Sequence, residues 1–138
     1  MSITVYAREE EVPAGVYLSD CAVSGGSLPA YLDAVRTAAE GRLCVVLSPV
    51  YMDFPLPCPT GVGTILSAQQ LRQLRGNAPC YFSKALCTEY FTYLKDGQAH
   101  VVLFDSPNSL RAKLQAIQAA GISMVLIPDA NLRKTLQC

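Results

Sequence analysis

Six cysteines are the residues that could most readily do chemistry, because thiolates bind metals, form disulfides and attack electrophiles. They are Cys21, Cys44, Cys58, Cys80, Cys87 and Cys138. No Cys-x-x-Cys occurs, the closest pair has six residues between its members, and His100 is the only histidine. A zinc site needs four converging nitrogen or sulfur ligands, usually at short paired spacings. The spacing therefore predicts free thiols packed as small apolar side chains in a reducing compartment, with no metal and no cofactor.

Two aspartates and a tyrosine are the candidate ligand-binding residues. Asp20 follows a short apolar segment. Tyr51 and Asp53 follow the longer apolar run 43–47. In β/α proteins, ligand-binding groups gather at the carboxyl ends of the strands. The alternative is structural, with Tyr51 as an ordinary strand-end residue and both aspartates in turns. His100 has no cysteine or serine partner near it in sequence, so we expect it to be structural as well.

Other catalytic and nucleotide-binding patterns are excluded by their spacing. No serine stands in the Gly-x-Ser-x-Gly turn of a hydrolase nucleophile. Gly61-Val62-Gly63 lacks the Lys-Ser/Thr of a P-loop and the spacing of a dinucleotide-binding loop. The formal net charge of +0 also removes the basic surface that nucleic-acid binding needs, so we expect no nucleic-acid partner.

Charge is divided unevenly along the chain. Residues 1–53 hold seven acidic and three basic side chains, a net charge of −4. Residues 54–138 hold eight basic and four acidic side chains, a net charge of +4. Either folding averages this division out, or complementary faces associate head to tail or about a twofold axis.

The elements that must position these residues begin with two short strands. Residues 3–6 and 16–18 are expected to be strands, separated by a charged turn. Ser27 is a suitable N-cap for a helix that Gly41 ends. The run 43–47 is almost wholly apolar, which is typical of a strand covered on both faces. A helix followed by a buried strand predicts a parallel β/α arrangement.

A different pattern fills the middle of the chain. The proline- and glycine-rich stretch 55–63 is expected to be a loop, and Ser67 begins a short helix with a capping box. Asp96-Gly97 predicts a tight hairpin turn between strands at 90–94 and 99–104, because both turn residues must accept positive φ.

The last third of the chain returns to the β/α pattern. Ser106 caps a helix, and an apolar strand at 122–127 and a short helix at 130–136 follow. The chain is thus predicted to be one α/β domain over residues 1–138, with a mostly parallel sheet and an inserted α+β hairpin segment at approximately 55–105.

Three segments also carry a resemblance to a known family. Residues 45–54 read Val-Val-Leu-Ser-Pro-Val-Tyr-Met-Asp-Phe. Residues 90–105 begin with Tyr-Phe-Thr-Tyr, contain Asp-Gly and end with His-Val-Val-Leu-Phe-Asp, and residues 109–129 follow. In this order they resemble the seventh strand, the inserted hairpin, and the last helix and strand of glycoside hydrolase family 18 barrels, in the chitinase-like and spore-cortex-hydrolase group. By the same register, residues 16–20 would be the sixth strand. The resemblance implies part of a TIM barrel.

The departures from that family concern its catalytic and sugar-binding residues. The family's Asp-Gly-x-Asp-x-Asp-x-Glu motif, whose glutamate is the general acid, occurs nowhere, and an alternative register puts Cys21 in the place of that glutamate. The chain has no tryptophan, and Pro128 stands where the family has the tryptophan that stacks on sugar. Met52 replaces the seventh-strand glycine. A complete barrel takes about 250 residues, against 138 here.

The resemblance and its departures together favour a non-catalytic assembly or binding module. An incomplete barrel leaves strand edges and apolar faces uncovered, and a homo-oligomer, most simply a twofold dimer, would cover them. One alternative is residual binding of chitin or peptidoglycan oligosaccharides by Asp20, Tyr51 and Asp53. Another is an enzyme of a different class that uses Asp20 or Cys21 in a rebuilt cleft. No signal peptide is visible, and no apolar run approaches the roughly 18 residues of a spanning helix. We therefore expect a cytoplasmic protein without a membrane partner.

Overall fold

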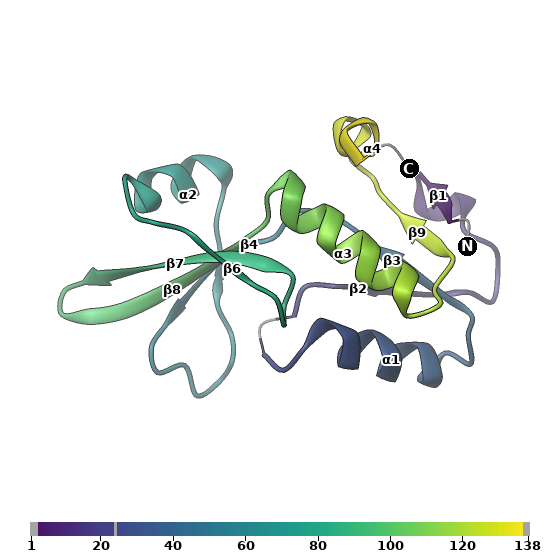
Figure 1. Ribbon diagram of the computed structural model, residues 1–138, viewed down its shortest axis with the longest axis horizontal. Coiled ribbons are helices and arrows are strands. Elements are labelled where there is room, and N and C mark those ends of the chain that lie inside the picture. Colours follow the sequence, from purple (N-terminus) through teal and green to yellow (C-terminus); the bar gives the residue numbers. More distant parts are fainter. Residues whose placement is uncertain (1–2, 24, 137–138) are drawn as a thin grey trace.

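Two sheets with different strand directions form the molecule, of which the computed structural model describes residues 3–23 and 25–136 (Figure 1). The parallel sheet comprises β1 (Thr4–Tyr6), β2 (Tyr17–Asp20), β3 (Leu43–Val46) and β9 (Met124–Leu126). With it go the 3-10 turn η1 (Glu9–Glu11) and the helices α1 (Leu28–Ala38), α3 (Pro107–Ala119) and α4 (Ala130–Leu136). The antiparallel sheet comprises β4 (Tyr51–Pro55), β5 (Thr64–Ile65), β6 (Tyr81–Ser83), β7 (Thr88–Lys95) and β8 (Gln98–Phe104), together with helix α2 (Ala68–Arg75). These two groups of elements are called the parallel unit and the antiparallel unit below.

The parallel sheet has the strand order β1-β9-β3-β2. All of its pairings are parallel, and one row of residues runs in register across it: Thr4, Met124, Cys44 and Leu18. A closed β/α barrel places its first strand beside its eighth, and β1 stands beside β9 in the same way. The predicted mostly parallel β/α arrangement is confirmed. The sheet has a fourth strand, β1, beyond the three barrel strands for which the resemblance accounted.

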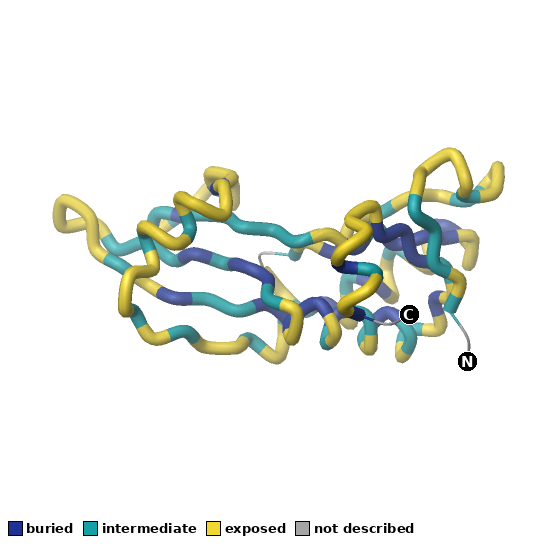
Figure 2. Tube along the Cα trace, turned by 90° about the horizontal axis from the view of Figure 1, so that it is seen from above, coloured by how far each residue is buried: buried dark blue, intermediate teal, exposed yellow. Residues whose placement is uncertain are grey.

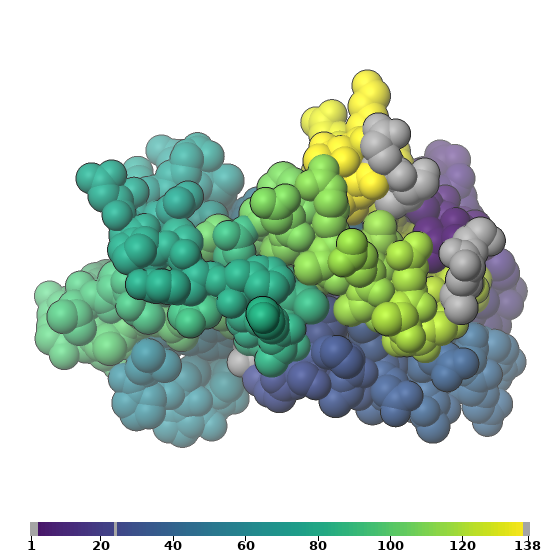
Figure 3. Space-filling view, viewed as in Figure 1, coloured from purple at the N-terminus to yellow at the C-terminus, as the bar shows by residue number. Residues whose placement is uncertain are grey.

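The helices of the parallel unit pack on one face of its sheet. Apolar residues of the strands and of three helices share a single buried cluster, which includes Val45, Val125, Leu32 of α1, Ile117 of α3 and Leu132 of α4. Figure 1 shows α3 crossing in front of the strands and α1 running alongside β2, and Figure 3 shows both helices on the near surface of the molecule. Successive side chains of a strand point to opposite faces. The residues between those of the cluster therefore point to a face that carries no helix among the described residues.

The antiparallel sheet has the order β5-β4-β8-β7-β6 and packs one face against α2. The core on that side consists of Leu66, Phe91, Val102 and Phe104, with Leu71 and Leu74 of α2 against it. The loop 56–63 borders the opposite face. Gly63 is needed where this loop meets the sheet, because a Cβ there would lie 2.7 Å from the Phe54 ring.

Local signals in the sequence place most of the element ends correctly. Ser27 Oγ accepts a hydrogen bond from the Ala30 N–H at the start of α1, and the Ser67 capping box forms. Asp96 and Gly97 have φ of +52° and +77°, as a type I′ hairpin turn requires.

The end of α1 differs from its prediction. The helix ends at Ala38, and Glu40, with φ +53°, takes a left-handed conformation before Gly41 does at φ +78°. Two consecutive left-handed residues turn the chain into β3. Gly41 therefore shares with Glu40 the role that the sequence assigned to glycine alone.

A buried ion pair joins the two units. Asp105 follows β8 and Lys113 lies on α3, and their side chains are 0% and 2% exposed, with Nζ 2.9 Å from Oδ2. Ser109 Oγ donates to Oδ1 at 2.7 Å, and the Val50 N–H donates to Oδ2 at 3.1 Å. The carboxylate thus accepts three hydrogen bonds, which is the condition under which a buried charge is tolerated. The pair connects α3 of the parallel unit with the ends of two antiparallel strands.

Burial follows the same division of the molecule. Buried residues lie in the middle of both units, and the hairpin tips and loops are exposed (Figure 2). Within residues 3–23 and 25–136, no helix combines the length and the apolar character that crossing a bilayer demands.

Candidate functional site

Asp53 lies on β4, and both of its carboxylate oxygens are occupied. Tyr93 Oη on β7 donates to Oδ2 at 2.5 Å. His100 Nδ1 on β8 lies 3.1 Å from Oδ1. Because a carboxylate only accepts hydrogen bonds, His100 carries its proton on Nδ1. The rings of Tyr93 and His100 stack with their centroids 4.7 Å apart, so three strands are linked by one compact polar cluster.

The protonation of Tyr93 suits a structural role for this cluster. Burial, together with the hydrogen bond to Asp53, raises the pKa of Tyr93 to about 12. The phenol therefore keeps its proton at neutral pH and continues to donate to the carboxylate. Each carboxylate oxygen of Asp53 already has a partner within the protein. These contacts form a polar clasp, the cluster of Asp53, Tyr93 and His100 that links β4, β7 and β8.

Sequence spacing could not have shown this cluster. His100 was expected to be structural, but its partner Asp53 stands 47 residues away along the chain. The antiparallel register brings them together, because β4 pairs with β8 and Tyr93 lies directly opposite His100. The sequence did contain one usable signal. Side chains alternate between the two faces of a strand, and this alternation along β4, β7 and β8 puts Asp53, Tyr93 and His100 on the same face of the sheet.

Tyr51 and Asp53 follow the parallel strand β3 and lie on β4, a strand of the antiparallel sheet. The sequence placed both just beyond the carboxyl end of a parallel strand. β3 ends at Val46, and β4 begins at Tyr51 in the antiparallel sheet. Pro49 stands between the strands and has no N–H to continue a ladder, which explains the break. The side chain of Tyr51 packs against the core of the antiparallel unit.

Asp20 stands apart from the other two predicted residues. It ends β2 at an open edge of the parallel sheet, where it is exposed and lies opposite Val46. Within the described part of the chain, no hydrogen bond or ion pair joins Asp20 to Tyr51 or Asp53. The three candidate ligand-binding residues are therefore divided between the two units.

Cys21 has the surroundings of a buried apolar side chain. It is 3% exposed, and its Sγ–H points to the Val46 carbonyl oxygen at 3.6 Å. Burial raises the pKa of Cys21 to about 12, and the pKa of Cys44 is raised to about 11 for the same reason. Such thiols stay protonated at neutral pH and are poor nucleophiles.

The other cysteines are also free where the structure describes them. Cys58 and Cys80 are partly exposed and Cys87 is buried. Cys138 lies outside the described residues. Within those residues, no group of three or more histidine, cysteine, aspartate or glutamate side chains could hold a metal ion.

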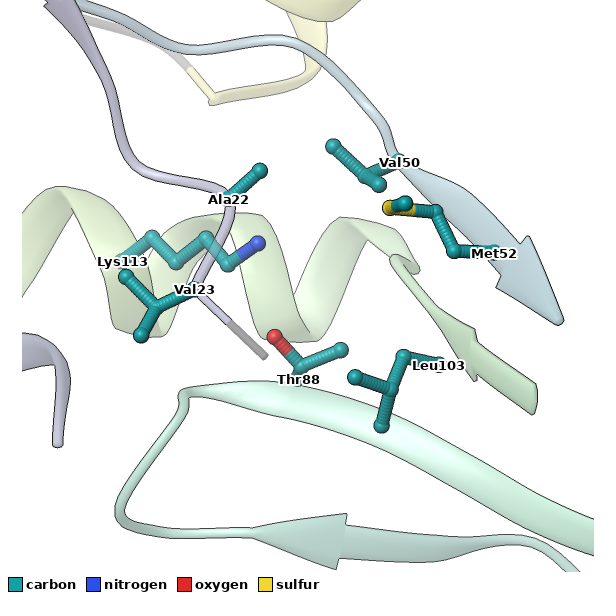
Figure 4. Close-up of a pocket in the computed structure, with 7 residues that line it drawn as sticks. All are labelled: Ala22, Val23, Val50, Met52, Thr88, Leu103 and Lys113. Carbon is teal, nitrogen blue, oxygen red and sulfur yellow. The ribbon is translucent and has the colours of Figure 1, made fainter. Parts of the chain in front are cut away.

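Three hollows are candidates for a ligand. A small cavity of about 90 Å³ lies between the units, bordered by Val23, Met52, Thr88 and Lys113 (Figure 4). Its one charged group, Lys113, is already paired with Asp105. A larger apolar hollow of about 450 Å³ lies between the antiparallel sheet and the loop 56–63.

The third hollow is a groove of about 270 Å³ beside β2, lined by Tyr17, Leu18 and the apolar residues of α1 that face it. Tyr17 and Leu18 are 56% and 37% exposed. An apolar groove therefore runs along the unpaired edge of the parallel sheet.

Comparison with known proteins shows the fold. No known family profile matches the chain, and no curated protein matches it. Solved structures do match. They include the spore cortex-lytic enzyme SleL of Bacillus cereus (16% identity, 88% of this chain and 35% of that chain, TM-score 0.64). SleL of Bacillus megaterium also matches (16% identity, 83% of this chain and 30% of that chain, TM-score 0.60).

A chitinase from Chromobacterium violaceum is similar at 18% identity, over 81% of this chain and 38% of that chain, with a TM-score of 0.59. These likenesses confirm the resemblance at the level of the fold. The chain has the fold of a part of these spore cortex-lytic and chitinase structures, and it spans about a third of their length.

Proposed function

We propose that this chain is a non-catalytic assembly module that associates with itself through the open side of its parallel sheet. One observation carries the proposal: among residues 3–23 and 25–136, no strand pairs with the outer edges of β1 and β2, and α1, α3 and α4 lie on one face of the sheet. Strands of a parallel sheet are normally covered on both faces. A second copy of the chain would supply the missing cover, and twofold pairs are the commonest way in which proteins do this.

The character of the open surface supports association. Leu18 exposes a large apolar side chain on the open face. Tyr17, which pairs with Leu43 of the helix-facing cluster, exposes its ring on the α1 side of the same sheet edge, beside the groove. Unpaired strand edges and contiguous apolar surface both favour binding to another protein surface.

The candidate catalytic groups support a non-catalytic role. The sequence holds no family general-acid motif. Both oxygens of Asp53 are bonded within the protein, and Cys21 is buried and protonated. A hydrolase of this kind needs a carboxylic acid that can protonate the leaving oxygen, and neither Asp53 nor Cys21 is placed to do so. Asp20, the other candidate, is an exposed carboxylate at the sheet edge and does not lie in the buried setting that such an acid needs.

Light scattering at increasing protein concentration tests the proposal. We expect the molar mass to rise from 14.9 kDa toward twice that value. Leu18→Lys, on the open face, is expected to return the mass to that of one chain. Leu94→Lys is the matched control, because Leu94 is 76% exposed in the antiparallel hairpin and should leave the mass unchanged. A wild-type mass that stays at one chain up to high concentration would contradict the proposal.

A second candidate function is saccharide binding at Asp20. The observation that favours it is an exposed carboxylate at the carboxyl end of a parallel strand, the side on which β/α folds bind ligands. Calorimetric titration with chitin and peptidoglycan oligosaccharides tests it. Heat that is lost in Asp20→Asn but kept in Asp96→Asn would support binding there, whereas no heat with the wild-type chain would refute it.

A further inference from the structure

We infer that two copies close their parallel sheets into one eight-stranded barrel, with β1 of each copy pairing in parallel with β2 of the other. This rests on the proposed self-association and specifies its geometry. The inference follows from the number of strands, the direction of their free hydrogen-bonding groups and the side chains on the open face.

The strand count and order fit a twofold closure. The sheet reads β1-β9-β3-β2, with β1 and β2 at its two edges. A twofold axis parallel to the strands keeps all strands of both copies pointing in one direction. It also brings β1 of each copy beside β2 of the other, which leaves no free edge. Eight is the number of strands at which a parallel β/α sheet closes around a filled interior.

The free backbone groups of β1 point toward this seam. The Thr4 N–H donates to Ser123 O, and Tyr6 O accepts from the Ile127 N–H, so both residues are bonded on the β9 side. Because backbone groups alternate along a strand, the N–H and C=O of Val5 point to the open edge.

The free backbone groups of β2 point to its own open edge in the same manner. The Tyr17 N–H donates to Arg42 O on the β3 side. By alternation, the N–H groups of Leu18 and Asp20 face outward. The two edges therefore offer complementary donors and acceptors over strands of three and four residues.

The side chains on the open face match the interior of such a barrel. Alternation from the helix-facing cluster puts six apolar residues of each copy on this face: Tyr6, Leu18, Cys44, Val46, Met124 and Leu126. Cys44 and Leu126 are already buried within one copy, and the other four keep surface that a second copy would cover. A closed barrel of this type is filled by three layers of four side chains, about twelve in all. Two copies would supply that number.

The polar residues of the open face lie where a barrel tolerates them. Thr4 belongs to the row of residues nearer the amino ends of the strands, and Asp20 to the row nearer their carboxyl ends. Asp20 would therefore stand at the mouth of the barrel, where water can reach it. The helices would all lie outside, as the barrel requires, because α1, α3 and α4 share the opposite face.

Amide hydrogen exchange of the wild-type chain tests the closure without any substitution. The Val5 and Leu18 amides are expected to gain protection together as the concentration rises. The Ile65 amide is the control. It faces outward from the edge strand β5, since the next amide, Leu66 N–H, donates inward to Tyr51 O. It should gain no protection.

The pattern of protection separates the possible results. A wild-type chain that stays monomeric overturns both the proposed function and the closure. A dimer in which only one of the Val5 and Leu18 amides is protected has paired β1 with β1 or β2 with β2. A dimer in which neither is protected has stacked its sheets face to face. These last two results overturn the closure and leave self-association standing.

Proline substitutions give an independent test, because proline removes an outward N–H without removing a bond inside the sheet. Val5→Pro and Leu18→Pro should each weaken association by about tenfold or more, while Ile65→Pro should leave it unchanged. Circular dichroism would establish that each variant is folded. Full association of either folded edge variant would contradict the closure.

Discussion

The antiparallel unit and the parallel unit differ in how far the chain itself covers their sheets. In the antiparallel unit, α2 packs on one face and the loop 56–63 borders the other. In the parallel unit, α1, α3 and α4 share one face and leave the other without a helix. The polar groups differ as well, since Asp53 is bonded inside its own unit and Asp20 is exposed at an edge. Under the proposed function, the parallel unit is the part of the molecule that a second copy of the chain would cover.

The largest effect is expected at the joint between the units. Lys113→Met would leave the Asp105 carboxylate buried without its counter-charge and should lower the free energy of unfolding by about 3–5 kcal/mol. The double variant Lys113→Met/Asp105→Asn removes both charges and should recover much of that loss. Urea unfolding measures both. If Lys113→Met alone were neutral, the two units would not depend on this ion pair.

The two faces of the parallel sheet should respond differently to truncation. Ile117→Ala, on the helix-covered side, should cost about 2–5 kcal/mol at every protein concentration. Met124→Ala, on the open side, should lower the free energy of unfolding only slightly in dilute solution. The loss should grow with protein concentration, as the chains associate. Thermal unfolding over a range of concentrations measures both variants. A cost for Met124→Ala that does not change with concentration would remove the difference between the faces.

The polar clasp of the antiparallel unit should stabilise that unit without affecting association. Asp53→Asn weakens the acceptor of two hydrogen bonds and should lower the free energy of unfolding by about 1–3 kcal/mol. Tyr93→Phe removes one of these bonds and should cost less. Neither variant should change the molar mass of the wild-type assembly. A change in mass would show that the antiparallel unit takes part in association.

A smaller effect should appear at high pH. The pKa of Tyr93 is raised from the ordinary 10.0 to about 12, because burial disfavours the charged phenolate and the hydrogen bond to Asp53 favours the protonated phenol. Its contribution to stability is therefore complete below pH 10 and is lost as the pH rises toward 12. The free energy of unfolding of the wild-type chain should therefore fall between pH 10 and pH 12 by an amount that is absent in Tyr93→Phe. Equal pH profiles for the two proteins would contradict the assignment.

Local patterns were enough to predict most elements of the fold. The capping serines, the Asp96-Gly97 turn and the apolar strand at 43–47 each depend on neighbouring residues, and each was predicted from the sequence. The family resemblance added the barrel-like order of three strands, which the neighbouring positions of β2, β3 and β9 in the parallel sheet match.

Contacts between distant residues could not be predicted in this way. Asp53 and His100 meet only because β4 pairs with β8, and β1 finds its place beside β9 only across almost the whole chain. The division of residues 43–55 between β3 of the parallel sheet and β4 of the antiparallel sheet depends on the same kind of long-range pairing. That Tyr51 and Asp53 lie on a strand of the antiparallel sheet could not be predicted from local patterns, and ligand binding by either of them stays a prediction.

Methyl NMR of the wild-type chain at increasing concentration tests the central claim most directly, because it reports on both units in one sample. The account predicts that the methyl signals of Leu18, Val46 and Met124 shift as the open face becomes buried. The signals of Leu71 and Leu74, which pack inside the antiparallel unit, should stay in place. Open-face signals that do not move, or shifts confined to the antiparallel unit, would contradict the account.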